Sequence, residues 1–299
     1  MKRFIFQLTL FALLVLGAFL FVLSRANGKI DPFYLRFTTP QQENLIIGTS
    51  RAAQGLQPKV LNSLCQIRFF NYAFTASHSP FGEIYFNSIQ RKLKKGNTPG
   101  TFIVTVDPWS ISSKTDDPNW TSGFRELDSC LANTKFVNSN PNFLYLLNNL
   151  GGEYYKALDQ RSSQLLLHED GWLEVSVDMS PVAVEKRLHS KIELYREEML
   201  PHYQFSSVRF EYLRKTIELL NDHGRVFLVR MPVHPKMMEF EQELMPDFDD
   251  KIGKISSLTE GYLNMTKQNQ KYEFTDGNHL NKTSGKLVSK EVALWIMKK

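Results

Sequence analysis

The residues best suited to joint chemistry are a serine near the start of the chain and an aspartate–histidine pair near its end. Ser50 lies within NLIIGTSRAAQGLQP (residues 44–58), directly after a short apolar run. Asp276 and His279 lie three positions apart in FTDGNHLN. At that spacing a carboxylate can hold one imidazole nitrogen and leave the other free to take a proton from a serine hydroxyl. The three residues therefore predict a serine nucleophile.

Each of the two motifs can also be interpreted as an ordinary turn. Gly-Thr-Ser is common strand-cap chemistry, and Asp, Gly and Asn in a row are typical of turns. The catalytic interpretation is supported by where Ser50 would lie relative to the predicted sheet. The apolar run 45–47 predicts a buried strand, so Ser50 would stand at its carboxyl end. Backbone N–H groups after a nucleophile in that position can stabilise an oxyanion.

The elements that would position these residues alternate along the chain. Apolar runs predict strands, and amphipathic patterns predict helices between them. Such alternation indicates an α/β sandwich with a mostly parallel sheet. The predicted strands are 45–47, 67–70, 101–106, 225–229 and 272–274, and the predicted helices are 58–64, 81–94, 207–223, most of 236–267 with a break near Pro246, and 283–298.

Several further polar residues follow predicted strands, where ligands of parallel sheets bind. Arg51 could bind an anionic group of a substrate or pair with Asp107. His234, between two prolines, could line the pocket or be a structural histidine. The other residues at strand ends are those of the loop that begins at Asn71.

The serine after the first strand and the D-x-x-H before the last helix resemble the SGNH (GDSL-like) hydrolase superfamily over residues 44–299. The resemblance implies a flavodoxin-like three-layer α/β/α fold, a triad of Ser50, His279 and Asp276, and no cofactor. GTSRAAQGLQP, FFNYAF and DGNHLNKTSG look like the membrane-anchored members that serve D-alanyl-lipoteichoic-acid transfer and alginate-type O-acetylation. The implied partners are an acylated glycan or envelope polymer and a membrane-bound acyl-transfer protein.

Two positions depart from that family's pattern. The family's second block supplies a glycine N–H to the oxyanion hole, but residues 71–79 contain no glycine, so Thr75, Ala76 or Ser77 would have to offer its backbone. The third block supplies an asparagine, where this chain has Asp107. An ionised carboxylate cannot donate a hydrogen bond. Either Asn71 or Arg51 replaces the family's asparagine as a donor to the oxyanion, or the oxyanion hole is weak.

Residues 107–206 interrupt the alternation. Helices are predicted near 142–149 and 181–198, with a strand signal only at 172–177. A segment of this length is not a plain loop. We interpret residues 111–206 as an inserted, largely helical subdomain or lid.

The first 25 residues predict a transmembrane anchor. An apolar run covers residues 4–23, about the length that spans a bilayer. Lys2 and Arg3 favour a cytoplasmic N-terminus, which places the rest of the chain outside the inner membrane. The alternative is a cleaved signal peptide, for which Ser24-Arg25-Ala26 is a passable site. Residues 26–43 contain Pro32 and Pro40 and predict a linker or loosely packed arm.

Composition excludes several function classes. A hydrophobic fraction of 42% with 22% charged residues is that of a globular protein. The net charge of +5 is dispersed, which argues against nucleic acid as a partner. There is no phosphate-binding glycine loop, CxxC or HExxH, so nothing indicates a nucleotide or a metal.

Cys65 and Cys130 are expected to be buried free thiols, although an oxidising compartment would allow them to pair.

These observations predict an exported, membrane-anchored serine esterase or O-acyltransferase. Ser50 would accept an acyl group and pass it to water or to a sugar hydroxyl, and the sequence does not choose between these acceptors. The alternative is a non-catalytic envelope or polysaccharide assembly factor that uses the same cleft for binding. The missing glycine and asparagine favour that alternative, and the presence of all three triad residues opposes it.

Overall fold

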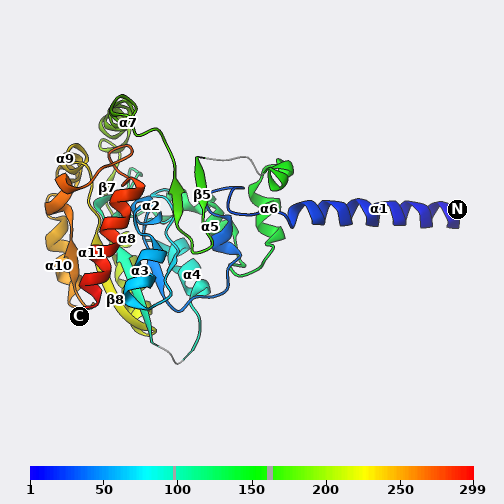
Figure 1. Cartoon of the computed structure of the whole chain (residues 1–299), viewed down its shortest axis with the longest axis horizontal. Helices are drawn as coiled ribbons and strands as arrows, with labels where there is room; N and C mark the ends of the chain where they lie inside the picture. Colours follow the sequence, from blue (N-terminus) through cyan, green and yellow to red (C-terminus); the bar gives the residue numbers. More distant parts are fainter. Residues whose placement is uncertain (97–98, 160–163) are drawn as a thin grey trace.

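A five-stranded parallel sheet positions the candidate site. In the computed structural model, residues 1–96, 99–159 and 164–299 are described, and they form an α/β domain from which one long helix projects (Figure 1). The strands follow the order β2 (Phe70–Asn71), β1 (Leu45–Ile47), β3 (Gly100–Thr105), β8 (Gly224–Arg230) and β9 (Tyr262–Asn264), and every neighbouring pair is parallel.

Both faces of the sheet are buried, which explains why its strands are apolar without alternation. Leu45 and Ile47 of β1 belong to one hydrophobic core, and Ile46 between them belongs to another. Helices α4 (Glu83–Lys92), α8 (Ser207–Asn221) and α10 (Phe248–Ser256) contribute to the first core. Helices α2 (Ser50–Gly55), α3 (Pro58–Cys65) and α11 (Lys282–Ile296) contribute to the second.

The predicted last strand is wrong. Residues 272–274 form only an isolated bridge between Phe274 and Leu280. The fifth strand is β9, inside the region 236–267 that was predicted to be helical. The rest of that region forms α9 (Pro235–Leu244), α10 and the 3-10 turn η7 (Thr266–Lys271). Strand β9 has only three residues, all half-buried, which is too short a run for a hydrophobic period to be recognised. It is extended because it pairs with β8.

The segment predicted as one inserted subdomain is spread over the domain. Its first part packs against the first core through α5 (Cys130–Asn133), α6 (Phe143–Asn149) and the 3-10 turn η5 (Tyr154–Leu158). A hairpin of β5 (Leu165–Leu167) and β6 (Leu173–Val175) packs against the second core. Among the described residues of this segment, only α7 (Pro181–Leu194) and the π-helical turn η6 (Tyr195–Met199) that continues it reach the candidate site. Residues 160–163 of the predicted insertion lie outside the described residues.

The remaining short elements connect these parts. The 3-10 turn η2 (Pro108–Ile111) leaves β3, and β4 (Ser112–Ser113) pairs with β7 (Gln204–Phe205) just before α8. Two more 3-10 turns, η3 (Thr121–Gly123) and η4 (Arg125–Asp128), lead to α5.

Residues 26–43 are not a loosely packed arm, which corrects the prediction. The 3-10 turn η1 (Tyr34–Phe37) places Tyr34 and Phe37 fully inside the first core. The Arg36 guanidinium is buried as well and donates to the carbonyl oxygens of Asn71 (3.1 Å) and Gly171 (2.7 Å). Prolines and polar residues gave this segment the composition of a linker, but its aromatic residues anchor it to the core.

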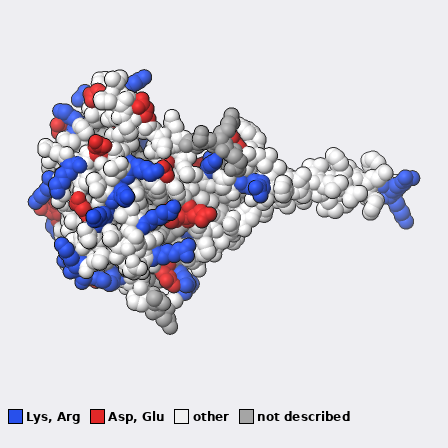
Figure 2. Space-filling model, in the orientation of Figure 1, with Lys and Arg blue, Asp and Glu red and all other residues white. Residues whose placement is uncertain are grey.

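Helix α1 (Lys2–Leu23) is long and apolar enough to cross a membrane. Most of it projects from the domain with its side chains exposed, and its basic residues lie at the far tip (Figure 2). Its last turn belongs to the domain. Leu23 is fully buried, and the ring of Phe19 packs edge-on against Tyr154 with centroids 5.0 Å apart.

The two cysteines are free thiols, as expected. Cys130 is buried and Cys65 is half-buried. Burial raises the pKa of both thiols, that of Cys130 to about 12. Both groups are therefore protonated and unreactive near neutral pH.

Candidate active site

Ser50 is held by a tight passage from β1 into α2. Gly48 has a φ of +151°, and a Cβ atom there would lie 1.8 Å from Thr105 Oγ1, so only glycine fits beside β3. Thr49 is the residue before the helix, and Ser50 is its first residue. The sequence predicted a serine at the tip of a turn, and the structure places it at the N-terminus of a helix.

Asp276 and His279 are held together by the turn that precedes α11. Asp276 Oδ1 accepts hydrogen bonds from the backbone N–H groups of Asn278 and His279, each at 3.0 Å. His279 Nδ1 lies 2.9 Å from both carboxylate oxygens. The Thr275 N–H donates to the His279 carbonyl at 2.8 Å and closes the turn. The ring orientation is thus set by local hydrogen bonds, as the motif predicts.

The two parts meet at hydrogen-bond distance. His279 Nε2 lies 2.8 Å from Ser50 Oγ, although 229 positions separate the residues in sequence. With Asp276 on Nδ1, the imidazole donates from Nδ1 and accepts the serine proton at Nε2. The arrangement is a continuous hydrogen-bonded chain from serine to carboxylate.

A lysine that sequence reasoning missed stabilises the charge of Asp276. Lys191 of α7 places Nζ 3.3 Å from Asp276 Oδ2. Burial by itself would raise the pKa of Asp276, but His279, Lys191 and the N–H of Asn278 together hold that pKa well below its usual range. Asp276 is therefore ionised at neutral pH. No sequence pattern links Lys191 to the triad, because packing alone brings α7 to this turn.

Ser50 and His279 face a pocket of about 290 Å³. The loop after β2 forms one side with Thr75, Ala76 and Ser77, as predicted. The opposite side comes from the α7–η6 segment and from η2, and sequence reasoning did not assign its residues to the site. They are Trp109, Lys191, Leu194, Tyr195 and Met199.

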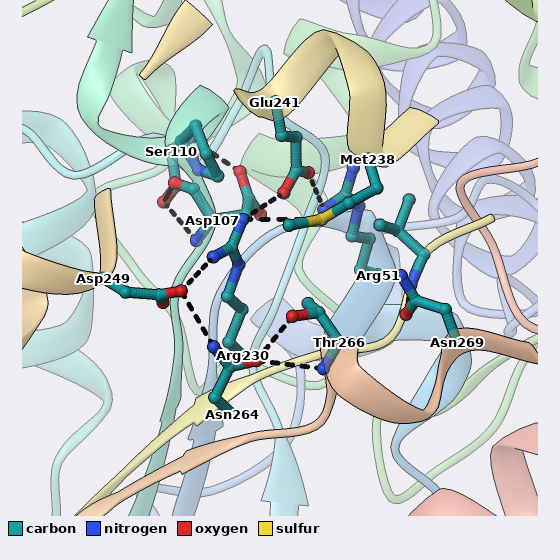
Figure 3. Close-up of polar contacts among 12 residues, drawn as sticks. Arg51, Asp107, Ser110, Arg230, Met238, Glu241, Asp249, Asn264, Thr266 and Asn269 are labelled. Carbon is teal, nitrogen blue, oxygen red and sulfur yellow. Dashed lines mark hydrogen bonds and ion pairs between the residues drawn. The ribbon is translucent and has the colours of Figure 1, made fainter. Parts of the chain in front are cut away.

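Arg51 lines the pocket as predicted, but its guanidinium is engaged by Glu241 and Asn278 rather than by a direct hydrogen bond to Asp107. Its guanidinium is buried, forms an ion pair with Glu241 and donates from Nη2 to Asn278 Oδ1 at 2.8 Å. Glu241 also accepts from Arg230 Nη2 at 2.8 Å, and Arg230 Nη1 lies 2.9 Å from Asp249 Oδ2 (Figure 3). Burial would lower the pKa of Arg51, but Glu241 and Asp107 raise it above its ordinary value.

Asp107 supports the residue that precedes the serine. Its Oδ1 accepts from the Ser110 N–H at 2.9 Å, which caps η2, and its Oδ2 accepts from Thr49 Oγ1 at 3.2 Å. Burial raises the pKa of Asp107, and Arg51 opposes this. Asp107 lines the pocket, but its carboxylate oxygens serve as acceptors.

Asn71 and His234 are not in the pocket, which corrects two predicted site residues. Asn71 donates both amide hydrogens to the carbonyl oxygens of Ala52 and Leu56, each at 2.9 Å, and so fastens the end of α2. His234 caps α9 by accepting from the Lys236 N–H at 3.2 Å. It lines a separate cavity of about 410 Å³ behind the Asp276–His279 turn.

Backbone N–H groups next to Ser50 are the remaining candidates for oxyanion donors. The N–H groups of Ala52 and Ala53 donate to the Thr49 carbonyl. Those of Ser50 and Arg51 open α2, where a helix leaves its N–H groups without an intrahelical acceptor. They lie beside the Ser50 hydroxyl in the first turn of this six-residue helix. Within residues 1–96, 99–159 and 164–299, no group of three or more His, Cys, Asp and Glu residues could hold a metal ion.

No protein-family model and no curated protein matches this sequence. Interpretation of the site therefore depends on its geometry.

Proposed function

We propose that this protein is a membrane-anchored serine esterase or O-acyltransferase of the SGNH type, acting on acyl esters of cell-envelope or exopolysaccharide material. One observation carries the proposal. Ser50, His279 and Asp276 form an unbroken hydrogen-bonded chain, with distances of 2.8 and 2.9 Å, that opens into a pocket.

The reaction follows from that chain. His279 Nε2 removes the proton from Ser50 as Oγ attacks the carbonyl carbon of an acyl ester. The tetrahedral intermediate collapses, and His279 returns the proton to the departing alcohol, which leaves an acyl-serine. Water or a sugar hydroxyl then attacks the acyl-serine with His279 again as the base. The product is a free acid in the first case and a new ester in the second.

The N–H groups of Ser50 and Arg51 stabilise the oxyanion in this scheme, together with the backbone of residues 75–77 across the pocket. Backbone N–H groups can thus take the part of the asparagine side chain that the family supplies. The scheme thus accommodates Asp107, which instead fixes Thr49 through its hydroxyl.

The sheet supports a flavodoxin-like three-layer fold for the catalytic domain, residues 44–299. The order β2-β1-β3-β8-β9 has the first strand between the second and third, as in flavodoxin-like sheets. Helices α2, α3 and α11 pack on one face and α4, α8 and α10 on the other, the division that right-handed crossovers produce for this order.

The anchor supports an inner-membrane location with the domain on the extracytoplasmic side. Lys2 and Arg3 precede the apolar helix, which favours a cytoplasmic N-terminus. The buried Leu23 favours retention of α1, because cleavage at Ser24-Arg25-Ala26 would remove part of the core. A membrane protein that delivers acyl groups is the partner this arrangement suits.

Labelling with a fluorophosphonate probe tests the proposal on the full chain in detergent. We expect the wild type to be labelled, Ser50→Ala to remain unlabelled, and His279→Ala to react at least about a thousandfold more slowly. Ser63→Ala and His189→Ala, both exposed on the surface away from the pocket, are matched controls that should react like the wild type. A folded wild type without labelling would favour the assembly-factor role, to which the carboxylate at position 107 points.

A further inference from the structure

An exposed apolar surface surrounds the point where α1 joins the domain. We call it the collar and define it by Leu144 and Leu147 of α6 and Tyr155 and Leu158 of η5. Their side chains are between 42% and 62% exposed. Clusters of exposed leucine and tyrosine are unusual on a water-facing surface and mark interaction sites.

The α6 half of the collar lacks the charges that make a helix face soluble, whereas in the η5 half an exposed ion pair of Glu153 and Lys156 lies beside Tyr155. Residues 136–152 contain no Asp, Glu, Lys or Arg. On α6, Tyr145 and Leu146 face the core, so the outward positions should be charged or polar, yet two of them are leucine. On the face shown in Figure 2, most charged residues lie on the part of the domain away from α1, and a few lie near its base.

The position of the collar relative to α1 is fixed by direct packing. Phe19, in the last turn of α1, contacts Tyr154, the neighbour of Tyr155 in η5. Figure 1 shows α6 beside the end of α1 where the helix enters the domain. The collar and the last turn of α1 therefore lie at the same level along the helix axis.

The length of α1 indicates that the collar lies near a membrane surface. Its 22 residues extend about 33 Å, against about 30 Å for a hydrocarbon core. Lys2 to Phe19 covers about 26 Å of that length, so with Lys2 and Arg3 at one interface the turn containing Phe19 lies just inside the opposite one. Leucine and tyrosine side chains are suited to that boundary, where tyrosine in particular is enriched.

We propose that the collar inserts into the lipid headgroup–acyl boundary beside α1, so that the domain is seated on the bilayer at two contacts rather than tethered by one helix. This rests on the proposed anchoring of α1. Lipid is the occupant that the geometry favours, because the collar continues the apolar surface of the membrane-spanning helix. Since α7 lies on the part of the domain farther from α1 (Figure 1), seating would hold the Ser50 pocket away from the bilayer, facing polymer rather than lipid.

Site-specific fluorescence tests the contact on the full chain in nanodiscs of equal parts phosphatidylethanolamine and phosphatidylglycerol. Leu147→Cys and Tyr155→Cys, each on a Cys65→Ser background, are labelled with an environment-sensitive dye. Lipids carrying a spin label near the glycerol end of the acyl chain are the quencher. We expect blue-shifted emission and loss of most of the fluorescence at both positions. Val182→Cys on α7, where the side chain is 81% exposed, should show neither effect.

Two outcomes would overturn the proposal. Water-like emission at Leu147→Cys would show an exposed collar, and blue-shifted emission without quenching would show a collar covered by protein, such as a second copy of this chain, in place of lipid. Leu13→Cys, in the middle of α1, distinguishes a wrong collar proposal from a helix α1 that does not span the bilayer. If quenching by lipids labelled deep in the chain occurs at Leu13→Cys and not at the collar, α1 spans the bilayer and only the collar proposal fails. Fluorophosphonate labelling of the same nanodiscs reports independently on Ser50.

Discussion

At the scale of single residues, the candidate triad depends on a contact from outside its own motifs. The turn around Asp276 supplies the hydrogen bonds that orient His279, but Lys191 of α7 adds a positive charge 3.3 Å from the carboxylate. Helix α7, which lines the pocket, is therefore linked electrostatically to the carboxylate that holds the His279 ring.

Lys191→Met should make the protein more sensitive to acid. The folded-state pKa of Asp276 is depressed, so ionised Asp276 stabilises the fold above its unfolded pKa of about 3.9, and this contribution is lost as pH falls through the folded pKa. Loss of Lys191 raises the folded pKa, which reduces stability at neutral pH by about 0.5–1 kcal/mol and moves the acid loss to higher pH.

Urea unfolding of the Lys191→Met variant across a pH series measures both effects. Lys186→Met, exposed on the same helix, is the control and should follow the wild type. An unchanged pH dependence in Lys191→Met would mean that the lysine does not interact with Asp276 in solution.

At the scale of elements, the ion-pair network around Glu241 joins four of them. Arg51 belongs to α2, Glu241 to α9, Arg230 to the end of β8, and Asp249 to α10. The network fixes the first turn of α2, which carries Ser50, to the helices beyond the sheet.

Glu241→Gln should therefore be strongly destabilising. It leaves two buried guanidinium groups without their shared carboxylate, a loss of about 3–5 kcal/mol in the free energy of unfolding. Denaturant unfolding measures this. Glu239→Gln, exposed on the same helix, should change stability by less than about 0.5 kcal/mol. Equal stability of the two variants would contradict a structural role for the network.

The turn between Asp276 and His279 requires glycine at position 277. Its φ is +91°, and a Cβ atom would lie 2.7 Å from Leu188 Cδ1 of α7. We expect Gly277→Ala to cost about 1–3 kcal/mol through backbone strain and to slow probe labelling by displacing His279.

Gly253→Ala is the matched control for Gly277→Ala. Gly253 lies within α10 with open space around its missing side chain, so alanine there should be neutral or stabilising by up to about 1 kcal/mol. Thermal unfolding of both variants measures the change in stability, and their rates of probe labelling measure the change in reactivity. If Gly277→Ala were as stable and as reactive as the wild type, the turn would not require a left-handed residue.

At the scale of the whole molecule, α1 is both an apolar projection and part of the core. A fragment that starts at residue 27 loses Leu23 and the Phe19–Tyr154 contact, whereas one that starts at residue 18 keeps them. Burial of one leucine side chain contributes about 1.5–3 kcal/mol. The longer fragment should be the more stable by at least that amount in urea unfolding. Equal stabilities would mean that the last turn of α1 contributes nothing to the fold.

Local patterns in the sequence were enough to predict β1, β3 and β8, the main helices and the residues of the candidate triad. Apolar runs and amphipathic spacing reflect burial of each element by itself, and the D-x-x-H spacing sets its own turn geometry. The apolar length of α1 was equally visible. None of these features depends on knowing what lies across the core.

Tertiary structure alone decided the partners. Arg51 pairs with Glu241, 190 positions away, and not with Asp107, and Lys191 reaches Asp276 from α7. Asn71 turned inward to α2, β9 formed by pairing with β8, and residues 26–43 joined the core through two aromatic side chains. These outcomes depend on which surfaces meet when the elements pack. From the sequence it follows that a buried charged or amide side chain needs a hydrogen-bond or ion-pair partner. Which residue becomes that partner depends on how the chain folds.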